Sequence, residues 1–372
     1  MRIHIFGSIF NNTGYDSHCR QLVNALYKEN PDISLDTPKN DDWVRYANDN
    51  ELKIIKTPYD DSATTIMIGQ PQFWRYSMAD KPKRFGGFVV WEGEYIPTYW
   101  LEYLADKRVD FILTPSNHVK NAILNTINKV ENTAFKSFYK GISDIANKIH
   151  IVPHGVDTEL FLPEPTLKET PFTFIMNKGW SQGLNDRGGI QYALKAFHKE
   201  FDTSEPVQMI AKINPVYNLP GWNLDNQMQA IGIDGITNIK INLDSVPFNY
   251  IPKLYNRGHV FVSSTRCDAF NLPGLEAMSC SLPTIQTNYG GQIDYMTKEN
   301  SLYVDYKLEE VDHDIVYEGN KWASPDILDL RKKLRYAFDH KNEMEKMGTK
   351  ALLDSKQWTW NNSVKKLLKV LE

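Results

Sequence analysis

The 372-residue chain has little of several features that mark particular protein classes. Its three cysteines (Cys19, Cys267 and Cys280) fit no metal-ligand spacing and cannot all pair, which indicates a reducing compartment. The formal net charge is only −4, so no global positive field exists to hold nucleic acid. No stretch approaches a membrane span, and the apolar run in MRIHIFGSIF is too short for a secretory signal. We therefore expect a cytoplasmic protein that contacts a membrane at most peripherally.

Short apolar runs alternate with helical segments along the whole chain, which is long enough for two cores. A helix is expected from about Asp16, where four apolar residues follow the spacing of one helical face: Cys19, Leu22, Val23 and Leu26. The expected strands are Arg2–Phe6, Ala63–Ile68, Phe88–Trp91 and Phe111–Leu113, then Phe172–Met176, Val207–Ile213, Ile239–Leu243, Val260–Ser263 and Pro283–Gln286. This order predicts α/β architecture with mostly parallel sheets that helices cover on both faces.

The proline-rich piece Pro163–Pro171 separates the two series of strands and is predicted to be a linker. The expected domains are residues 1–165 and 166–350, both Rossmann-like and doubly wound. The segment 351–372 is expected to form an amphipathic helix that packs back toward the first domain. Ligands of such sheets bind at the carboxyl ends of the strands, so the cleft between the two domains is the predicted site.

The stretch STRCDAFNLPGLEAMSCSLPTIQTNYGG, which follows an expected strand, carries the strongest functional signal. Asn271 is a good N-cap and Pro273 fits a first helical turn, so Leu272–Cys280 is predicted to be helical. The free N–H groups at its start would stabilise a diphosphate. Asp268 stands just before this helix and Glu276 lies one turn inside it. The two carboxylates could therefore face a sugar and a ribose, an arrangement that suits a nucleotide diphosphate-sugar.

This stretch resembles the motif of glycosyltransferase family 4, in which two acids are also separated by seven residues. Other segments resemble one branch of that family in the same order, namely FVVWEGEYIP, DFILTPSNHVKNAI, IHIVPHGVDTELFLP, RGGIQYALKAF and KWASPDI. The resemblance covers most of the chain. It implies a GT-B fold and a metal-independent transfer of sugar with retention of configuration, by same-face attack. A UDP-sugar is the first expectation for the donor and a GDP-sugar the second, with no cofactor.

The sequence departs from the family's pattern at three places. Asp268 stands where the family usually has Glu, and Ser281 stands where it usually has Gly. The frequent Arg-Lys-Gly triplet reads Arg187-Gly188-Gly189, so the lysine that commonly grips the diphosphate is missing. Lys178 and Lys212, at the ends of two expected strands, are the candidate replacements, and Arg187 is a further candidate for a donor contact.

The remaining candidates are expected at other strand ends. By resemblance, Gly14 is the loop glycine that lets the backbone approach the donor phosphates. Gly290 and Gly291 permit close backbone approach to a bound group. Asn271 and Leu272 stand at the start of the helix that is expected to bind the donor. Glu92 could hold an acceptor hydroxyl or could pair with a neighbouring base. The acceptor could be a carbohydrate, a lipid or a protein.

Several other features favour structural interpretations. His118 is expected to pack or cap a helix, and His154 to serve the hinge turn. Trp91, Trp180 and Trp322 could be core residues or sugar platforms. The acidic pieces Asn40–Asp42 and Tyr59–Asp61 lack the context of a metal-binding motif. Two alternatives to a transferase remain open, a GT-B epimerase and a catalytically weak nucleotide-sugar-binding protein.

Overall fold

The computed structural model describes residues 1–11, 13–39, 47–78, 82–181, 183–214, 221–235, 237–312 and 314–372. The acidic piece Asn40–Asp42 therefore lies outside the described residues. The chain divides into two compact units, which are treated separately below. Unit 1 comprises Met1–Gly155 and Trp360–Glu372, and unit 2 comprises Val156–Thr359.

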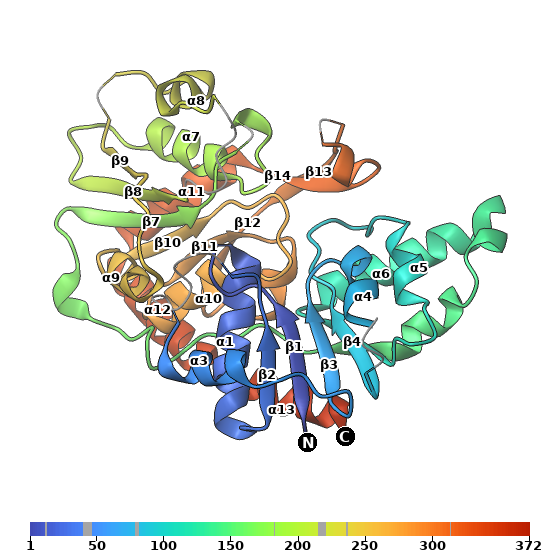
Figure 1. Cartoon of the computed structure of the whole chain (residues 1–372). Coiled ribbons are helices and arrows are strands. Elements are labelled where there is room, and N and C mark those ends of the chain that lie inside the picture. Colours follow the sequence, from blue (N-terminus) through green and yellow to red (C-terminus); the bar gives the residue numbers. More distant parts are fainter. Residues whose placement is uncertain are drawn as a thin grey trace. The chain divides into compact units, whose positions relative to one another are not determined.

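Unit 1 contains a six-stranded parallel sheet with helices on both faces, and both chain termini belong to it (Figure 1). The strand order is β2-β1-β3-β4-β5-β6. The strands are β1 (Ile3–Gly7), β2 (Ile33–Asp36), β3 (Thr64–Ile68), β4 (Arg84–Phe88), β5 (Phe111–Thr114) and β6 (Ile149–Ile151). The α-helices are α1 (Gly14–Glu29), α3 (Asp49–Lys56), α4 (Trp74–Ser77), α5 (Trp100–Leu104), α6 (Asn117–Glu131) and α13 (Trp360–Leu371).

The first helix of unit 1 shows how the sequence pattern becomes structure. The Thr13 side chain caps α1 by accepting a hydrogen bond from the Asp16 backbone N–H. The four apolar residues predicted to share one face of this helix are all fully buried, which confirms the prediction. The C-terminal helix α13 packs on α1, and the indole N–H of Trp360 donates to the side-chain oxygen of Gln21 at 2.8 Å. Residues from the two ends of the chain thus share one core.

Unit 2 contains a second six-stranded parallel sheet, in the order β12-β11-β10-β7-β8-β9. Its strands are β7 (Phe172–Lys178), β8 (Val207–Ile213), β9 (Ile239–Asn242), β10 (Val260–Ser263), β11 (Thr284–Thr287) and β12 (Ser301–Val304). Its α-helices are α7 (Ile190–Glu200), α8 (Leu224–Ala230), α9 (Ile251–Asn256), α10 (Leu272–Ser279), α11 (Ile327–Asp339) and α12 (Lys341–Ser355). An antiparallel hairpin of β13 (Tyr306–Glu310) and β14 (Lys321–Pro325) follows the sheet.

Both sheets reverse their strand order, as doubly wound sheets do. In unit 2 the chain runs from β7 outward to β8 and β9, then returns to place β10 on the other side of β7. In unit 1 the corresponding reversal lies between β1 and β3. The carboxyl ends of the strands at such a switch point border a natural ligand crevice. Each unit therefore has one edge at which functional residues are expected.

Some sequence predictions differ from the structure. The expected linker Pro163–Pro171 belongs to unit 2, where the Glu164 backbone N–H donates to the Asn256 side chain at 2.6 Å. The chain divides earlier, at Gly155 and Val156, because Val156 and Phe161 are buried in the core of unit 2. Within 351–372, residues up to Thr359 belong to unit 2 and α13 belongs to unit 1.

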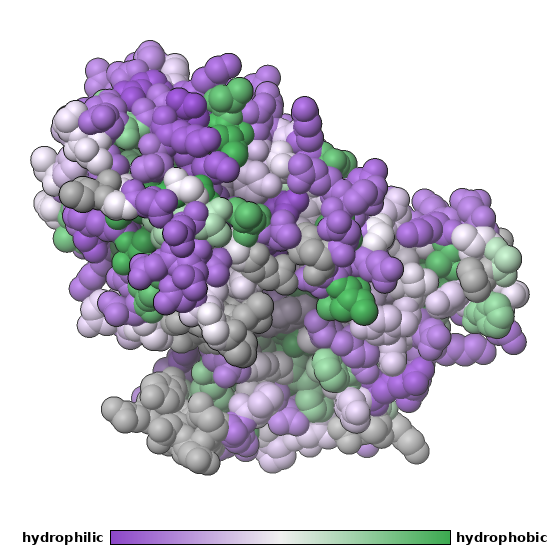
Figure 2. Space-filling view, turned by 90° about the horizontal axis from the view of Figure 1, so that it is seen from above, coloured by the Kyte–Doolittle hydropathy of each residue, from purple (hydrophilic) through white to green (hydrophobic). Residues whose placement is uncertain are grey.

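The surface carries no large apolar band in the view of Figure 2. Most of that face is hydrophilic, and hydrophobic residues appear on it in separate small patches. Among the described residues, no helix is both long and apolar enough to span a bilayer. The tryptophans Trp91, Trp180 and Trp322 are buried, so they are core residues rather than exposed sugar platforms.

Candidate functional site

The switch point of unit 2 brings together two residues that the sequence analysis singled out. Lys178 is the last residue of β7, and Asp268 lies in the loop after the adjacent strand β10. Their side chains form an ion pair, with Lys178 Nζ 2.6 Å from Asp268 Oδ2. The Asp268 side chain is 21% exposed and that of Lys178 is 9% exposed. A charged pair thus lies at the edge where a doubly wound sheet binds ligands.

The second oxygen of Asp268 organises the start of α10. Asp268 Oδ1 accepts the backbone N–H of Asn271 at 3.0 Å and, more weakly, that of Phe270 at 3.4 Å. Burial alone would raise the pKa of Asp268, but the positive charges of Lys178 and Arg187 lower it to about 2. Asp268 is therefore ionised at neutral pH and held in one orientation.

Arg187 lies in the loop before α7, close enough to Asp268 to lower its pKa. Its Nη1 donates to the Cys267 carbonyl at 2.8 Å, so the guanidinium anchors the loop that carries Asp268. The neighbouring Gly189 has a φ of +74°, and a Cβ there would lie 1.8 Å from the Ser264 carbonyl oxygen. Glycine is required here because the two loops pass too close for any side chain.

Glu276 lies inside α10 and is 5% exposed. Its Oε2 accepts the Tyr255 hydroxyl proton at 2.8 Å, and the Tyr255 oxygen accepts from Asn177 Nδ2 at 3.0 Å. Burial raises the pKa of Glu276 to about 7, although the Tyr255 hydrogen bond lowers it. Among the described residues, Tyr255 is the one side chain that donates to this carboxyl group. A buried carboxyl with spare acceptor capacity suits a ligand that brings hydroxyl groups.

Asn271 occupies the N-cap position of α10, but its side chain does not cap the helix. Asn271 has a φ of +63°, and its Nδ2 donates to Gln286 Oε1 at 2.7 Å and to Ser263 Oγ at 3.2 Å. The expected capping role was therefore wrong, because the left-handed backbone turns this side chain back into the sheet. The start of α10, at Leu272, is left without a side-chain cap.

Gly290 and Gly291 lie in the turn after β11 and pack directly against the Asp268 loop. The Gly291 N–H donates to the Asp268 carbonyl at 2.8 Å. A Cβ on Gly291 would lie 1.9 Å from the Ala269 carbonyl oxygen, and Gly290 has a φ of +102°. In the structure, these glycines therefore let two loops of unit 2 approach each other closely.

Lys212 lies near the end of β8, opposite Asn177 of β7 in the parallel register. It is 4% exposed, and its ammonium group donates to the Ile213 carbonyl at 2.9 Å. Burial lowers its pKa, while Asp244 raises it. Lys212 is thus not a solvated surface lysine.

Gly14 is the first residue of α1 in unit 1, after strand β1. A Cβ added to Gly14 would meet nothing within 4 Å, so packing within the protein does not require glycine there. Its φ is not in the left-handed region either. The Cβ position of Gly14, at the start of a 16-residue helix, therefore has no protein neighbour.

Glu92 follows the strand β4, which ends at Phe88 rather than at Trp91. Its backbone carbonyl contacts His118 Nε2 at 2.6 Å, which ties the loop to α6. His118 lies within α6, whose N-cap is Ser116, and it contacts this loop rather than capping the helix. The nearby Tyr15 hydroxyl donates to the Val90 carbonyl at 3.0 Å, so α1 holds the same loop. The side chain of Glu92 is half-buried.

Sequence reasoning missed the partners of Glu276. Tyr255 lies on α9 and Asn177 on β7, and the fold brings them to a carboxylate that is distant in sequence. Neither residue stands in a recognisable motif. Their position at the ends of elements adjoining the switch point is the one signal that could have indicated them.

No group of three metal-ligating side chains occurs in the described part of the chain. In the acidic piece Tyr59–Asp61, the Asp60 carboxylate accepts from Ser62 and pairs with Arg2 at the surface. This piece is a solvated turn, as predicted.

Comparisons with known proteins extend this description. No protein-family model matches the sequence. The chain is 24% identical over 274 residues to a probable sucrose-phosphate synthase of Thermosipho melanesiensis, a match that covers 73% of this chain. The chain spans about half of that relative's length, at 56%.

Several solved structures resemble the full chain, including the following two. One is Anabaena HepE in complex with UDP-glucose, with a TM-score of 0.69 and 12% identity, covering 100% of this chain and 99% of the other. The second is a sucrose-phosphate synthase from Thermosynechococcus elongatus, with a TM-score of 0.67 and 12% identity. It covers 100% of this chain and 98% of the other. The chain has the GT-B fold. This GT-B architecture consists of the two parallel six-stranded sheets with their covering helices.

Proposed function

We propose that this GT-B protein is a glycosyltransferase that moves a sugar from a nucleotide diphosphate-sugar to an acceptor hydroxyl. The observation that carries the proposal is the pair of carboxyl groups around the start of α10 in unit 2. Asp268 is ionised and held by Lys178, while Glu276 is buried with acceptor capacity to spare. The similarity to a probable sucrose-phosphate synthase and to a UDP-glucose complex supports the same class of reaction.

The donor is proposed to bind across the start of α10. Glu276 would accept hydrogen bonds from the ribose hydroxyls. The uncapped helix start at Asn271 and Leu272 would face the diphosphate, whose charge Lys178, Arg187 and Lys212 would neutralise. Gly290 and Gly291 would let a ligand approach the turn after β11, and Gly14 would present the first turn of α1 to the phosphates.

The reaction is proposed to retain the anomeric configuration, as in glycosyltransferase family 4. The acceptor oxygen forms a bond to the anomeric carbon, the bond from that carbon to the diphosphate oxygen breaks, and the acceptor proton passes to the departing phosphate. Asp268 would interact with the sugar of the donor during transfer, and Glu92 would orient the acceptor hydroxyl. Fixed positive charge beside the diphosphate can stabilise the leaving group without a metal ion, so we infer transfer of the metal-independent type.

The donor nucleotide, the class of acceptor and the location are proposed as follows. A UDP-sugar is the first expectation for the donor and a GDP-sugar the second. The acceptor would be a carbohydrate, a lipid or a protein rather than a nucleic acid. A cytoplasmic location agrees with three buried cysteines that form no disulfide with one another.

The proposal is tested by incubating the full chain with UDP-glucose, other UDP-sugars and GDP-sugars, with and without EDTA. Release of nucleoside diphosphate that depends on an added acceptor, and an α-linked product from an α-linked donor, are the expected results. Heat of binding without turnover would instead identify a nucleotide-sugar-binding protein, and a changed sugar still attached to its nucleotide would identify an epimerase. Activity lost in EDTA and restored by magnesium or manganese would refute metal independence.

The proposed role of Glu92 in orienting the acceptor hydroxyl is tested by the substitution Glu92→Gln. Binding of the nucleotide-sugar should be unchanged while transfer to the acceptor slows, because the carboxylate orients only the incoming hydroxyl. Slow hydrolysis of the donor by water should be less affected. Normal transfer by this variant would show that Glu92 is a structural residue.

A further inference from the structure

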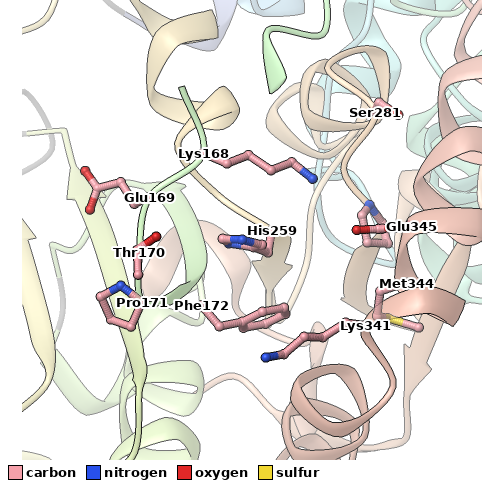
Figure 3. Close-up of a pocket in the computed structure, with 11 residues that line it drawn as sticks. Lys168, Glu169, Thr170, Pro171, Phe172, His259, Ser281, Lys341, Met344 and Glu345 are labelled. Atoms are coloured by element: carbon pink, nitrogen blue, oxygen red, sulfur yellow. The ribbon is translucent and has the colours of Figure 1, made fainter. Parts of the chain in front are cut away.

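Unit 2 has a cavity of about 300 Å³ at the edge of its sheet opposite Asp268 (Figure 3). Phe172, which begins β7, and His259, which directly precedes β10, form one wall. Ser281 and Pro283, between α10 and β11, line it as well, together with the first turns of α12. The cavity therefore lies at the amino ends of the strands whose carboxyl ends carry the candidate donor site.

Two exposed lysines, Lys168 and Lys341, line this cavity. Lys168 lies above the His259 ring in the view of Figure 3, and Lys341 lies below it beside Phe172. Within the described residues, neither lysine forms an ion pair, and the Lys341 ammonium is 5.5 Å from the centre of the Phe172 ring. Two carboxylates also line the cavity. Glu169 is already engaged by Arg257 and Gln208, and Glu345 forms no ion pair with Lys341.

His259 contributes a directed donor. Its Nδ1 accepts the Thr173 backbone N–H at 3.0 Å, so the neutral ring carries its proton on Nε2. The ring stacks on Phe172, with centroids 4.6 Å apart. Burial and the charges of Lys168 and Lys341 lower the pKa of His259 to about 4. The imidazole is therefore neutral at physiological pH.

The start of α12 also lines the cavity. Lys341 is the first residue of this 15-residue helix, and His340 at the N-cap makes no side-chain hydrogen bond to it. The first N–H groups of a helix favour a nearby anion. Lysines, an imidazole N–H and a helix start thus converge on one cavity from three separate elements.

We propose that this cavity binds a small soluble phosphomonoester. A phosphate dianion would be neutralised by Lys168 and Lys341 and would accept the Nε2–H of His259. The volume exceeds that of phosphate alone, so an organic remainder would lie against Phe172 and Met344. The inference concerns a site distinct from the proposed donor site and does not depend on the proposed function.

The cavity adjoins the segment that carries the candidate donor site. His259 precedes β10 and Ser281 follows α10, so the cavity touches both ends of the segment that carries Asp268 and Glu276. Ser281 holds a left-handed conformation, with φ at +63°, at the end of that segment.

The test is an NMR titration of the full chain at pH 7.5, with the ring signals of His259 assigned by their loss in His259→Asn. The probes are inorganic phosphate and glycerol 3-phosphate, and sodium chloride at equal ionic strength is the control. Both phosphates should move the His259 signals saturably, and the ester should bind more tightly than inorganic phosphate because it fills more of the cavity. Chloride should not move the signals.

The matched variants remove two charges each. Lys168→Gln combined with Lys341→Gln should abolish the phosphate response and raise the pKa of His259, since both lysines lower it in the native protein. Lys199→Gln combined with Lys332→Gln removes two exposed lysines outside the cavity and should preserve the response. An equal loss in the two double variants, or an equal response to chloride, would overturn the proposal. A response to phosphatidic acid vesicles alone would also overturn it, in favour of a lipid headgroup.

Discussion

The two units have the same kind of sheet, but the residues at their candidate functional edges are held in different ways. At the switch point of unit 2, charged and polar side chains hold one another in place, as Lys178 holds Asp268 and Tyr255 holds Glu276. At the corresponding edge of unit 1, Asp16 is held by Ser8 and Thr13, but a Cβ on Gly14 would meet no neighbour, and Glu92 lies in a loop held through its backbone.

This difference suggests a division of labour between preorganised and adaptable surfaces. A nucleotide diphosphate has the same ribose and phosphates whatever sugar it carries, so a rigid site can serve for it. Acceptors vary more in shape, and a loop that is held through its backbone, as at Glu92, can present different side chains to them.

The largest expected effect concerns the glycines of the two edges. Gly291→Ala should destabilise unit 2 by about 3 kcal/mol or more, because its Cβ would lie 1.9 Å from the Ala269 carbonyl oxygen. Gly14→Ala should change the stability of unit 1 by no more than about 0.5 kcal/mol, since its Cβ meets open space. Hydrogen exchange of β10 and α1 under increasing urea reports the two units separately. Similar losses in both variants would show that the edges are equally packed.

The next effect concerns donor affinity. Glu276→Ala should weaken UDP-glucose binding by roughly 1–3 kcal/mol, or about 5- to 150-fold in Kd, because the ribose hydroxyls lose their acceptor. Glu92→Gln, a carboxylate change in the other unit, is the matched control and should leave Kd unchanged. Titration calorimetry measures both. Donor binding that depends equally on both glutamates would contradict the assignment of the donor to unit 2.

The pH dependence of donor binding gives a smaller effect. The pKa of Glu276 is raised to about 7. In the unliganded protein, the contribution of the protonated carboxyl group to the free energy of unfolding is therefore lost as pH rises through 7. Ribose hydroxyls bind the ionised form better, so UDP-glucose affinity should rise about tenfold from pH 6 to pH 8. The diphosphate of UDP-glucose stays ionised over this range. Glu276→Gln should remove the dependence, and its persistence in that variant would assign it to another group.

Much of the fold could be predicted from the sequence where strands are apolar and well bounded. The predicted limits of β8 and β10 were confirmed in full, and those of α10 to within one residue. The strands β2 and β6 were missed because a polar residue, Ser34 or His150, interrupts each short apolar run, and β12, β13 and β14 were missed as well. The strand β4 was misplaced because two glycines interrupt it.

Those two glycines have a packing reason that a single sequence does not reveal. A Cβ on Gly86 would lie 2.2 Å from the Phe111 carbonyl oxygen, and one on Gly87 would lie 2.6 Å from that of Met67. At the candidate site, the motif indicated both acids, since local spacing carries them. The ion pair between Lys178 and Asp268, and the Tyr255 hydrogen bond to Glu276, depend on strand order and could not be read from spacing.

The smallest expected effect concerns Lys212, the only lysine that is buried in the described part of the chain. It lies near the carboxyl end of β8, beside the β7 strand that carries Lys178, and its ammonium group donates to the Ile213 carbonyl. A cation kept there against the cost of burial would contribute to phosphate binding if it can reach the diphosphate. Lys212→Met, which keeps the apolar stem, should weaken UDP binding about fivefold and hardly change UMP binding, because only the second phosphate loses a contact. Lys253→Met, at an exposed lysine of the same unit, is the control and should affect neither nucleotide. Unchanged UDP affinity in Lys212→Met would leave this lysine a structural residue, and the preorganised charge of unit 2 would then reside in Lys178, Arg187 and Asp268.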